Sequence, residues 1–297
     1  MIHVSLKFPS RAAPLFVLFI CSLTGAKFCH AQSTLAIVEA GVEQSEDSPF
    51  VRPSYEFLPG DYLYFTFQIA GFTVRSENRG EIEKISLSYE VTPQDFDGVA
   101  LTSPRSGSIE AELSSEDKHW QPRRRVSFLI PSFVAAGEFR VHVHVKDVFA
   151  NTEISQDTPF RIGGVEIPPT NTITVLNFHF YRGEEDVEPL QIPAYSPGDT
   201  VCIRFYMIGF KTDPQNQNRY RLSYGLTVLR PDGKTFVDKP NASELEAGSF
   251  YPARYLPGVV NLKTPSDAMR GEYVIVLTVR DAIGNATAQF RKAFSIE

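Results

Sequence analysis

One stretch of the sequence occurs twice, and it limits the possible folds more than any other feature. The chain reads Pro-Gly-Asp-Tyr-Leu-Tyr-Phe-Thr-Phe-Gln-Ile-Ala-Gly-Phe over 59–72 and Pro-Gly-Asp-Thr-Val-Cys-Ile-Arg-Phe-Tyr-Met-Ile-Gly-Phe over 197–210. In both copies apolar residues recur at every second position, which predicts a β-strand with one buried face. Pro-Gly-Asp ahead of each run is turn chemistry, because Pro fixes φ and Gly accepts a positive φ. We expect each copy to be the central strand of its own core.

The remainder of the chain also divides into two matching halves. Leu-Ser-Tyr recurs at 87–89 and 222–224, an Asp-Gly turn follows at 97–98 and 232–233, and a late strand opens with Gly-Glu at 137 and 271. About seven short alternating segments per half predict an all-β sandwich, since two stacked sheets bury one face of each strand. The Gly- and Pro-containing segment 162–169 is the expected linker. The predicted domains are therefore 32–164 and 165–297.

The first 31 residues have the pattern of a secretory signal peptide. Lys7 and Arg11 precede an apolar run over 12–23, and Cys29-His30-Ala31 offers a small-residue cleavage site. An apolar run of about 12 residues is short for a bilayer, which needs about 20. We expect a secreted protein, periplasmic or extracellular, with no membrane span once the signal is removed. The alternative is an uncleaved anchor.

Composition and charge narrow the classes of partner. Hydrophobic content of 42% and charged content of 22% are typical of a soluble globular protein. The formal charge is −6, and removal of the three cations of the signal, Lys7, Arg11 and Lys27, takes it to −9. Nucleic acid is not an expected partner of such an acidic chain.

The cysteine count excludes an internal disulfide after signal removal. Two of the three cysteines lie in the predicted signal, so Cys202 remains alone. We interpret Cys202 as a small, half-buried hydrophobe on the second Pro-Gly-Asp strand. A nucleophilic thiol or an intermolecular disulfide is the alternative interpretation.

A resemblance to a known group of domains rests on the best-matched segment. Residues 265–285 read Pro-Ser-x4-Gly-Glu-Tyr-Val-Ile-Val-Leu-Thr-Val-Arg-Asp-Ala-Ile-Gly-Asn, with 131–151 as their twin. This run resembles the penultimate strand and hairpin of bacterial immunoglobulin-like or fibronectin-type modules. The tandem arrangement is similar to uncharacterised exported two-repeat proteins of planctomycete-like bacteria. The resemblance implies two tandem immunoglobulin-like β-sandwiches and export, and it carries over no functional residues. Antibody-type domains differ in having paired cysteines and a core Trp.

The candidate ligand-binding residues are Trp120, Arg123, Arg124, Arg125 and Tyr251. The only Trp and the densest basic run lie together in 103–125, a region expected to be irregular. A Trp flanked by cations can stack on a sugar or bind an acidic partner. The alternative is structural, with Trp120 capping the core edge as Tyr255 does in the second half and the arginines balancing acidic loops.

Two further groups of residues suggest metal sites, although too few ligands accompany them. His142 and His144 share one face of a predicted strand, where they would form either a metal site or a solvated cationic face with Arg140 and Lys146. Asp-x-x-x-Asn recurs at 147–151 and 281–285, as calcium ligands or as turn residues. We favour the cationic face and the turns, and we expect neither a metal nor a cofactor.

No catalytic motif is present in the sequence. It contains no Gly-x-Ser-x-Gly, no His-Glu-x-x-His, no phosphate loop and no dinucleotide-binding Gly cluster. The predicted function is an exported non-enzymatic binding or structural module, with a protein or glycan partner in the envelope or outside the cell. The alternative is a carbohydrate-binding accessory protein that uses Trp120 and the Phe250-Tyr251 loop.

Overall fold

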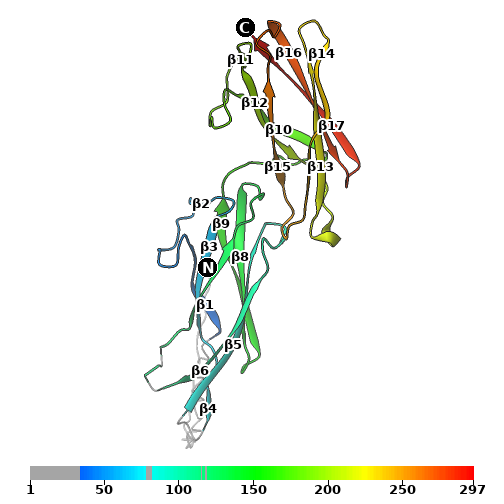
Figure 1. The fold of residues 1–297 in the computed structure, drawn as a ribbon. Coiled ribbons are helices and arrows are strands. Elements are labelled where there is room, and N and C mark those ends of the chain that lie inside the picture. Colours follow the sequence, from blue (N-terminus) through cyan, green and yellow to red (C-terminus); the bar gives the residue numbers. More distant parts are fainter. Residues whose placement is uncertain (1–33, 78–81, 115, 118) are drawn as a thin grey trace, which may run out of the picture. The chain divides into compact units, whose positions relative to one another are not determined.

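The computed structural model describes residues 34–77, 82–114, 116–117 and 119–297, so the predicted signal peptide at 1–31 lies outside the described residues. The described part is all-β apart from the short 3-10 helix η2, Pro214–Asn216 (Figure 1). Its strands are β1 (Ala36–Glu43), β2 (Glu56–Phe57), β3 (Tyr62–Ala70), β4 (Arg75–Glu77), β5 (Ile82–Gln94), β6 (Arg105–Leu113), β7 (Arg123–Leu129), β8 (Gly137–Asp147), β9 (Thr152–Ile162), β10 (Thr174–Tyr181), β11 (Ala194–Tyr195), β12 (Thr200–Ile208), β13 (Tyr220–Leu229), β14 (Thr235–Ala247), β15 (Tyr255–Lys263), β16 (Gly271–Asp281) and β17 (Ala286–Ile296). Among the described residues, no helix is long and apolar enough to cross a membrane.

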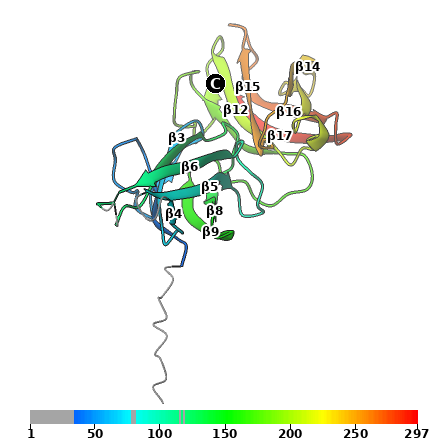
Figure 2. The same cartoon turned by 90° about the horizontal axis from the view of Figure 1, so that it is seen from below.

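Strands β1 to β9 form repeat 1, a sandwich of two sheets. The first sheet has the order β1-β3-β7. The second has the order β2-β9-β8-β5-β4, with β6 also paired to β5. Figure 2 labels β4, β5, β6, β8 and β9 of this sheet. All pairings are antiparallel except that of β2 with β9, which is parallel.

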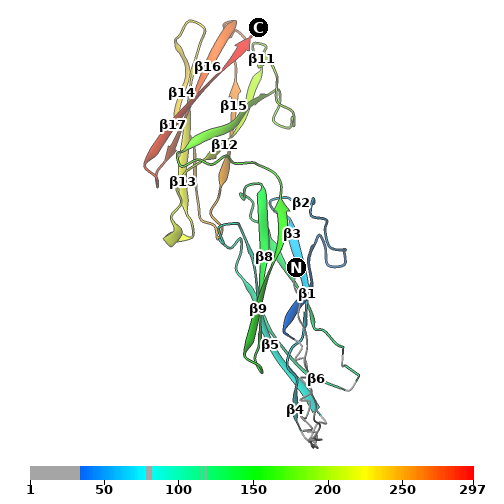
Figure 3. The ribbon, with the colours of Figure 1, turned by 180° about the vertical axis from the view of Figure 1, so that it is seen from behind.

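Strands β10 to β17 form repeat 2, which repeats this topology. Its sheets have the orders β10-β12-β15 and β11-β17-β16-β13-β14, and again the short strand β11 pairs in parallel with the last strand, β17 (Figure 3). Each long strand of one repeat therefore has a counterpart in the other. This arrangement confirms the predicted fold, two tandem immunoglobulin-like β-sandwiches related by an internal repeat.

The Pro-Gly-Asp turns have the same geometry in both repeats. Gly60 has φ 93° and Gly198 has φ 94°, a conformation that favours glycine. The carboxylates of Asp61 and Asp199 each accept the backbone N–H three residues earlier, at 2.7 and 2.8 Å. The strands that follow, β3 and β12, are central in their three-stranded sheets and carry Phe67 and Phe205, both at most 1% exposed.

A buried aspartate fastens the hairpin at the end of β8 in repeat 1, and its counterpart does the same after β16. One carboxylate oxygen of Asp147 accepts the N–H groups two and three residues later, and the other accepts the N–H of Thr73 at 2.6 Å. Asp281 makes the same three hydrogen bonds, the long-range one to Lys211 at 2.8 Å. Asn151 and Asn285 take the left-handed conformation in these hairpins. These residues have the turn role that we favoured over calcium binding.

A β-bulge interrupts the first strand of each repeat. The register of β1 against β3 shifts between Val38 and Gly41, and that of β10 against β12 shifts between Leu176 and His179. Gly41 lies opposite Thr66, and His179 lies opposite Arg204, which is the residue equivalent to Thr66 on the second central strand. Gly41 and His179 are therefore equivalent. The residues just before these two, Ala40 and Phe178, are equivalent as well.

The predicted irregular regions contain two long strands, which corrects the sequence-based expectation. β6 at 105–113 lies within the segment 103–125 that was expected to be irregular, and most of β14 at 235–247 lies within its expected counterpart, 238–258. Both strands are largely exposed, β14 along almost its whole length. A strand that buries few residues does not need an apolar alternation, so the pattern that identifies the other strands is missing here.

Candidate functional site

The candidate arginines lie on β7, where strand geometry separates them. β7 pairs with β3 so that Arg123 lies opposite Gln68 and Arg125 opposite Thr66. Since successive side chains alternate between faces, Arg123 and Arg125 share the outer face of the three-stranded sheet. Arg124 points to the other face, opposite the buried Phe67, and donates to the carbonyl of Arg123 at 2.8 Å.

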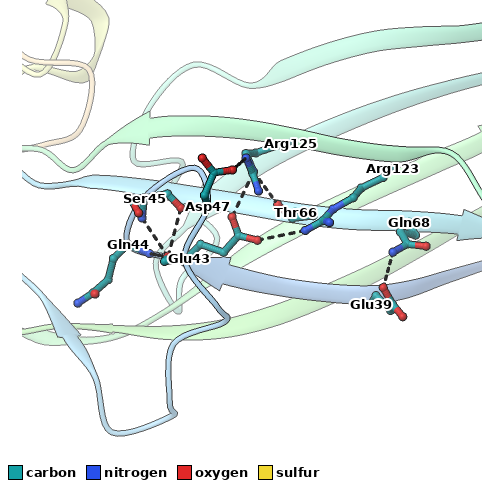
Figure 4. A network of polar contacts seen from close by, with 10 residues as sticks. Glu39, Glu43, Gln44, Ser45, Asp47, Thr66, Gln68, Arg123 and Arg125 are labelled. Atoms are coloured by element: carbon teal, nitrogen blue, oxygen red, sulfur yellow. Dashed lines mark hydrogen bonds and ion pairs between the residues drawn. The ribbon is translucent and has the colours of Figure 1, made fainter.

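Arg123 and Arg125 converge on Glu43, whose side chain is only 1% exposed. Arg123 Nη2 lies 3.5 Å from Glu43 Oε1, and Arg125 Nε lies 3.2 Å from Glu43 Oε2 (Figure 4). The Nε–H of Arg125 also donates to Thr66 Oγ1 at 3.2 Å, and Glu43 Oε2 makes no hydrogen bond within the described residues. Its contact with Arg125 is therefore an ion pair. Two cations offset the cost of burying this carboxylate.

The same face carries further acidic and amide groups. Arg125 Nη1 lies 3.7 Å from the exposed Asp47, and the Gln68 amide donates to Glu39 (Figure 4). We call the set Glu39, Glu43, Asp47, Thr66, Gln68, Arg123 and Arg125 the Glu43 network. Its arginines are already paired within the protein, which fits the structural interpretation that they balance acidic residues.

Trp120 lies in the turn ahead of β7. Its backbone N–H donates to the carbonyl of Asp117 at 2.9 Å, and 39% of the residue is exposed. Half-exposed Trp rings are common at binding surfaces, because one part is apolar and the indole N–H can find a polar partner. The ligand-binding role of Trp120 and the three arginines stays a prediction.

The comparison of Trp120 with Tyr255 is wrong by one residue. Arg123 on β7 lies opposite Gln68, and Pro257 on β15 lies opposite the equivalent residue of the second central strand, so Arg123 and Pro257 are equivalent. Three residues before them, Trp120 therefore corresponds to Arg254. The one-residue shift arose because both segments contain an aromatic residue close to a proline, a similarity that does not fix the strand register.

Tyr251, the fifth candidate, is buried against the other repeat. Its side chain is 4% exposed, and its hydroxyl donates to Asp95 Oδ2 at 3.0 Å. Arg254 donates to the same carboxylate oxygen at 3.1 Å and to the Tyr251 hydroxyl at 3.2 Å. Burial raises the pKa of Tyr251 to about 12. The ring of Tyr251 is therefore not presented to solvent, unlike that of Phe250, which is 55% exposed.

Each repeat also packs one aromatic side chain against the core of the other. Tyr251 belongs to repeat 2 but packs in the core cluster of repeat 1, whereas Phe133 of repeat 1 packs against the cluster of repeat 2. The ring of Phe133 meets that of Tyr255 edge-on at 6.0 Å, and the backbone N–H of Arg254 donates to the Phe133 carbonyl at 2.9 Å. We call Asp95, Tyr251, Arg254, Phe133 and Tyr255 the Asp95 junction. Both repeats belong to one compact unit of the chain, Ser33–Glu297.

Sequence reasoning missed Asp95, Arg254 and Phe133. Asp95 lies just after β5, where a carboxylate accepting the N–H groups of Asp97 and Val99 is ordinary turn chemistry. Nothing local indicates that its second oxygen binds residues more than 150 positions away.

The predicted cationic face of β8 carries acidic partners from β9. His142 Nδ1 lies 2.6 Å from Asp157 Oδ1, and Lys146 Nζ lies 3.0 Å from Glu153. The hydrogen bond and charge of Lys146 lower the pKa of the Glu153 carboxyl. His144 Nδ1 contacts Ser155 Oγ at 2.9 Å. The face is a ladder of ion pairs and hydrogen bonds, so its positive charge is largely offset.

Cys202 is a buried free thiol, 3% exposed, on the central strand β12. Burial raises the pKa of this thiol. A raised pKa disfavours the thiolate, which is the reactive form. The environment therefore agrees with the interpretation as a small hydrophobe, more fully buried than expected.

No family model matches the chain, and no curated protein matches it either. Among solved structures, the C-terminal domain of the Streptococcus agalactiae AgI/II polypeptide BspA is similar at 11% identity and a TM-score of 0.26, covering 86% of this chain and 99% of that one. The C-terminal domain of the Streptococcus pyogenes antigen I/II-family protein AspA shows 10% identity and a TM-score of 0.28, with 86% and 98% covered. A family 123 glycoside hydrolase from Clostridium perfringens shows 12% identity and a TM-score of 0.29 over 42% of this chain, which spans about a quarter of that enzyme (27%). At these TM-scores, our fold assignment rests on the strand pairing of the chain itself.

Proposed function

We propose that the chain is an exported, non-enzymatic binding or structural module in which two immunoglobulin-like repeats act as one coupled body. The Asp95 junction carries this proposal. It contributes a buried carboxylate, a buried tyrosine and an arginine to one hydrogen-bonded contact between the repeats. A module that transmits force or presents surfaces at a fixed spacing needs such coupling, because independent domains move relative to one another by default.

The use of the buried charged groups supports a non-enzymatic role. Asp147 and Asp281 hold hairpins, Asp95 holds the junction, and Glu43 is paired with two arginines. Each of these carboxylates is bound by groups of the protein that hold a strand, a hairpin or the junction in place, so each has a structural use. The proposed location, periplasmic or extracellular, and the likeness to two-repeat proteins of planctomycete-like bacteria rest on the sequence.

We place the partner-binding surface on the side of repeat 1 that carries Trp120 and Arg123, with a protein or glycan of the envelope as the partner. Arg123 keeps 56% of its side chain exposed while it pairs with Glu43. A half-exposed Trp and, three residues later in the chain, a partly exposed guanidinium are residue types that can contribute strongly to a protein interface.

A pull-down from native envelope extracts tests this proposal. We expect a defined partner to be retained by the wild-type chain and by Arg105→Ala, and to be lost with Trp120→Ala or Arg123→Glu. Arg105 is an exposed arginine at the start of β6, which makes it a matched control. A partner set identical for all four proteins would contradict the proposed surface.

The second candidate, a carbohydrate-binding accessory protein, is favoured by two exposed aromatic residues. Trp120 and Phe250 are 39% and 55% exposed, whereas the buried Tyr251 is not available to stack on a sugar. A glycan array with the wild-type chain, Trp120→Ala and Phe250→Ala separates the candidates. Reproducible sugar binding that either substitution removes would favour the carbohydrate role.

A further inference from the structure

Repeat 1 contains a cavity beside its first strand, β1. No residue of the Glu43 network or of the Asp95 junction lines it. The cavity has a volume of 480 Å³ and lies among β1, the loop over 50–55 and the strands β8 and β9. Its lining is mainly apolar, with Phe50, Val51, Pro53, Tyr55 and Phe160. Small-molecule sites typically have volumes of roughly 300–1,000 Å³ and mainly apolar walls.

Repeat 2 fills the equivalent space with its own side chains. Ala40, which lines the cavity, corresponds to Phe178 in the bulge of β10. Phe178 is 4% exposed and packs against the rings of Phe180, Phe205 and Phe290. The fold therefore accepts a large aromatic residue here, and the small Ala40 leaves the space open in repeat 1.

The second difference between the repeats lies on the last strand. Phe160 pairs with Phe139 in repeat 1, and Phe294 pairs with Tyr273 in repeat 2, so Phe160 and Phe294 are equivalent. Two residues before them, Thr158 therefore corresponds to Lys292. The Lys292 ammonium donates to the Phe178 carbonyl at 2.7 Å. Thr158 also lines the cavity, and its buried hydroxyl has no hydrogen-bond partner among the described residues. An unpaired buried hydroxyl is costly, which indicates that something polar completes it.

The charged residues of the lining indicate which charge a ligand in this cavity would carry. Arg161 is paired with Glu138 at 3.0 Å and with Glu56 at 3.4 Å. Arg52 lines the same cavity, is exposed, and forms no ion pair within the described residues. Among the charged side chains that line the cavity itself, Arg161 and Glu138 offset each other and Arg52 remains as a cation, while Glu56 is not part of the lining.

We infer that this cavity binds a small organic acid with an apolar body. The body packs among Phe50, Val51 and Phe160, the carboxylate meets the guanidinium of Arg52, and the hydroxyl of Thr158 gains a partner inside the cavity. The site is separate from the Trp120 surface, so it goes beyond the function proposed above.

Isothermal titration of the purified chain with phenylbutyrate tests the inference, with the uncharged phenylbutanol as the matched probe. We expect saturable 1:1 binding of phenylbutyrate and about tenfold weaker binding of phenylbutanol, the factor that one charge-assisted hydrogen bond supplies. Arg52→Gln should remove this preference for the acid, because it leaves the apolar walls in place. Ala40→Phe, which introduces the residue of repeat 2, should abolish binding of both probes.

Circular dichroism checks that Ala40→Phe folds. If it does not, Arg52→Gln still tests the inference independently, because Arg52 is exposed and its replacement leaves the core unchanged. Absence of saturable phenylbutyrate binding at millimolar concentration would overturn the inference. It would also be overturned by equal affinities for acid and alcohol in the wild-type chain, or by unchanged binding in a folded Ala40→Phe variant.

Discussion

At the scale of single residues, charge burial has the largest consequences. Glu43 is almost completely removed from water, and its desolvation is offset by the side chains of Arg123 and Arg125. Removing one partner of a buried ion pair usually costs more than the pair contributes, because the remaining charge stays desolvated. The stability of β1 against β3 and β7 therefore depends on arginines for which the sequence offered two roles, binding a ligand or balancing acidic loops.

Replacing Arg125 by Ala should lower the free energy of unfolding by about 1–3 kcal/mol, since Glu43 then keeps only the longer contact to Arg123. Chemical denaturation measures the change. Arg105→Ala, an exposed arginine on β6, serves as the control and should change stability by no more than about 0.5 kcal/mol. Equal effects of the two substitutions would show that the Glu43 ion pairs contribute nothing.

Tyr251 predicts a loss of stability at alkaline pH. Its hydroxyl ionises at pH ~10 in an unfolded chain, but with a pKa of about 12 in the folded protein. The unfolded chain therefore releases this proton first, so the contribution of Tyr251 is complete below pH ~10 and is lost as the pH rises towards 12. The loss is on the order of 2 kcal/mol. Chemical denaturation at a series of pH values measures this loss. The free energy of unfolding of Tyr251→Phe should fall less steeply with pH in this window than that of the wild type, and equal slopes would rule the effect out.

At the scale of elements, the hairpins fastened by Asp147 and Asp281 are the most closely repeated feature. Each carboxylate binds two N–H groups of its own hairpin and one from the segment after the central strand. A residue that looks like a local turn former thereby joins both sheets of its sandwich.

Asp147→Ala should destabilise the protein by at least about 2 kcal/mol, because three N–H groups lose a buried acceptor. Asp281→Ala should have a similar effect through repeat 2. Asp157→Ala, which removes only exposed ion pairs on β9, should cost no more than about 1 kcal/mol. Urea titration of the three variants tests the order, and a loss at Asp147 no larger than at Asp157 would contradict the role assigned here.

Elements with a buried face were predictable from the sequence. The alternation around Phe67 and Phe205 identified β3 and β12, and the Gly-Glu runs identified β8 and β16, because core packing forces a period of two. β6 and β14 were missed because largely exposed strands leave few apolar marks. The Glu43 network and the Asp95 junction depend on register and on long-range contacts, which residue spacing alone does not specify.

At the scale of the whole molecule, the Asp95 junction decides whether the repeats unfold together. Asp95 is 6% exposed and receives hydrogen bonds from two side chains of the other repeat. Phe133 and Tyr251 add apolar contacts in both directions. Two sandwiches with separate cores are therefore joined by a small, specific contact.

Calorimetry tests this coupling. We expect one cooperative transition for the wild-type chain and two separate transitions for Asp95→Ala, because that change leaves Tyr251 and Arg254 without their shared acceptor. Asp97→Ala, an exposed neighbour in the same loop, should keep the single transition. A single transition in Asp95→Ala as well would mean that Asp95 does not couple the repeats.

The parallel pairing of β2 with β9 has a consequence for the order of folding. Glu56 on β2 pairs with Arg161 on β9, 105 residues later, and the same closure recurs between β11 and β17. Contacts of such long sequence separation form slowly, because a large loop must be ordered before they are made. During synthesis β9 is complete before β10 begins at Thr174, so repeat 1 can close while repeat 2 is still being made. The second sheet of each repeat therefore cannot be completed until its last strand, β9 or β17, has been made.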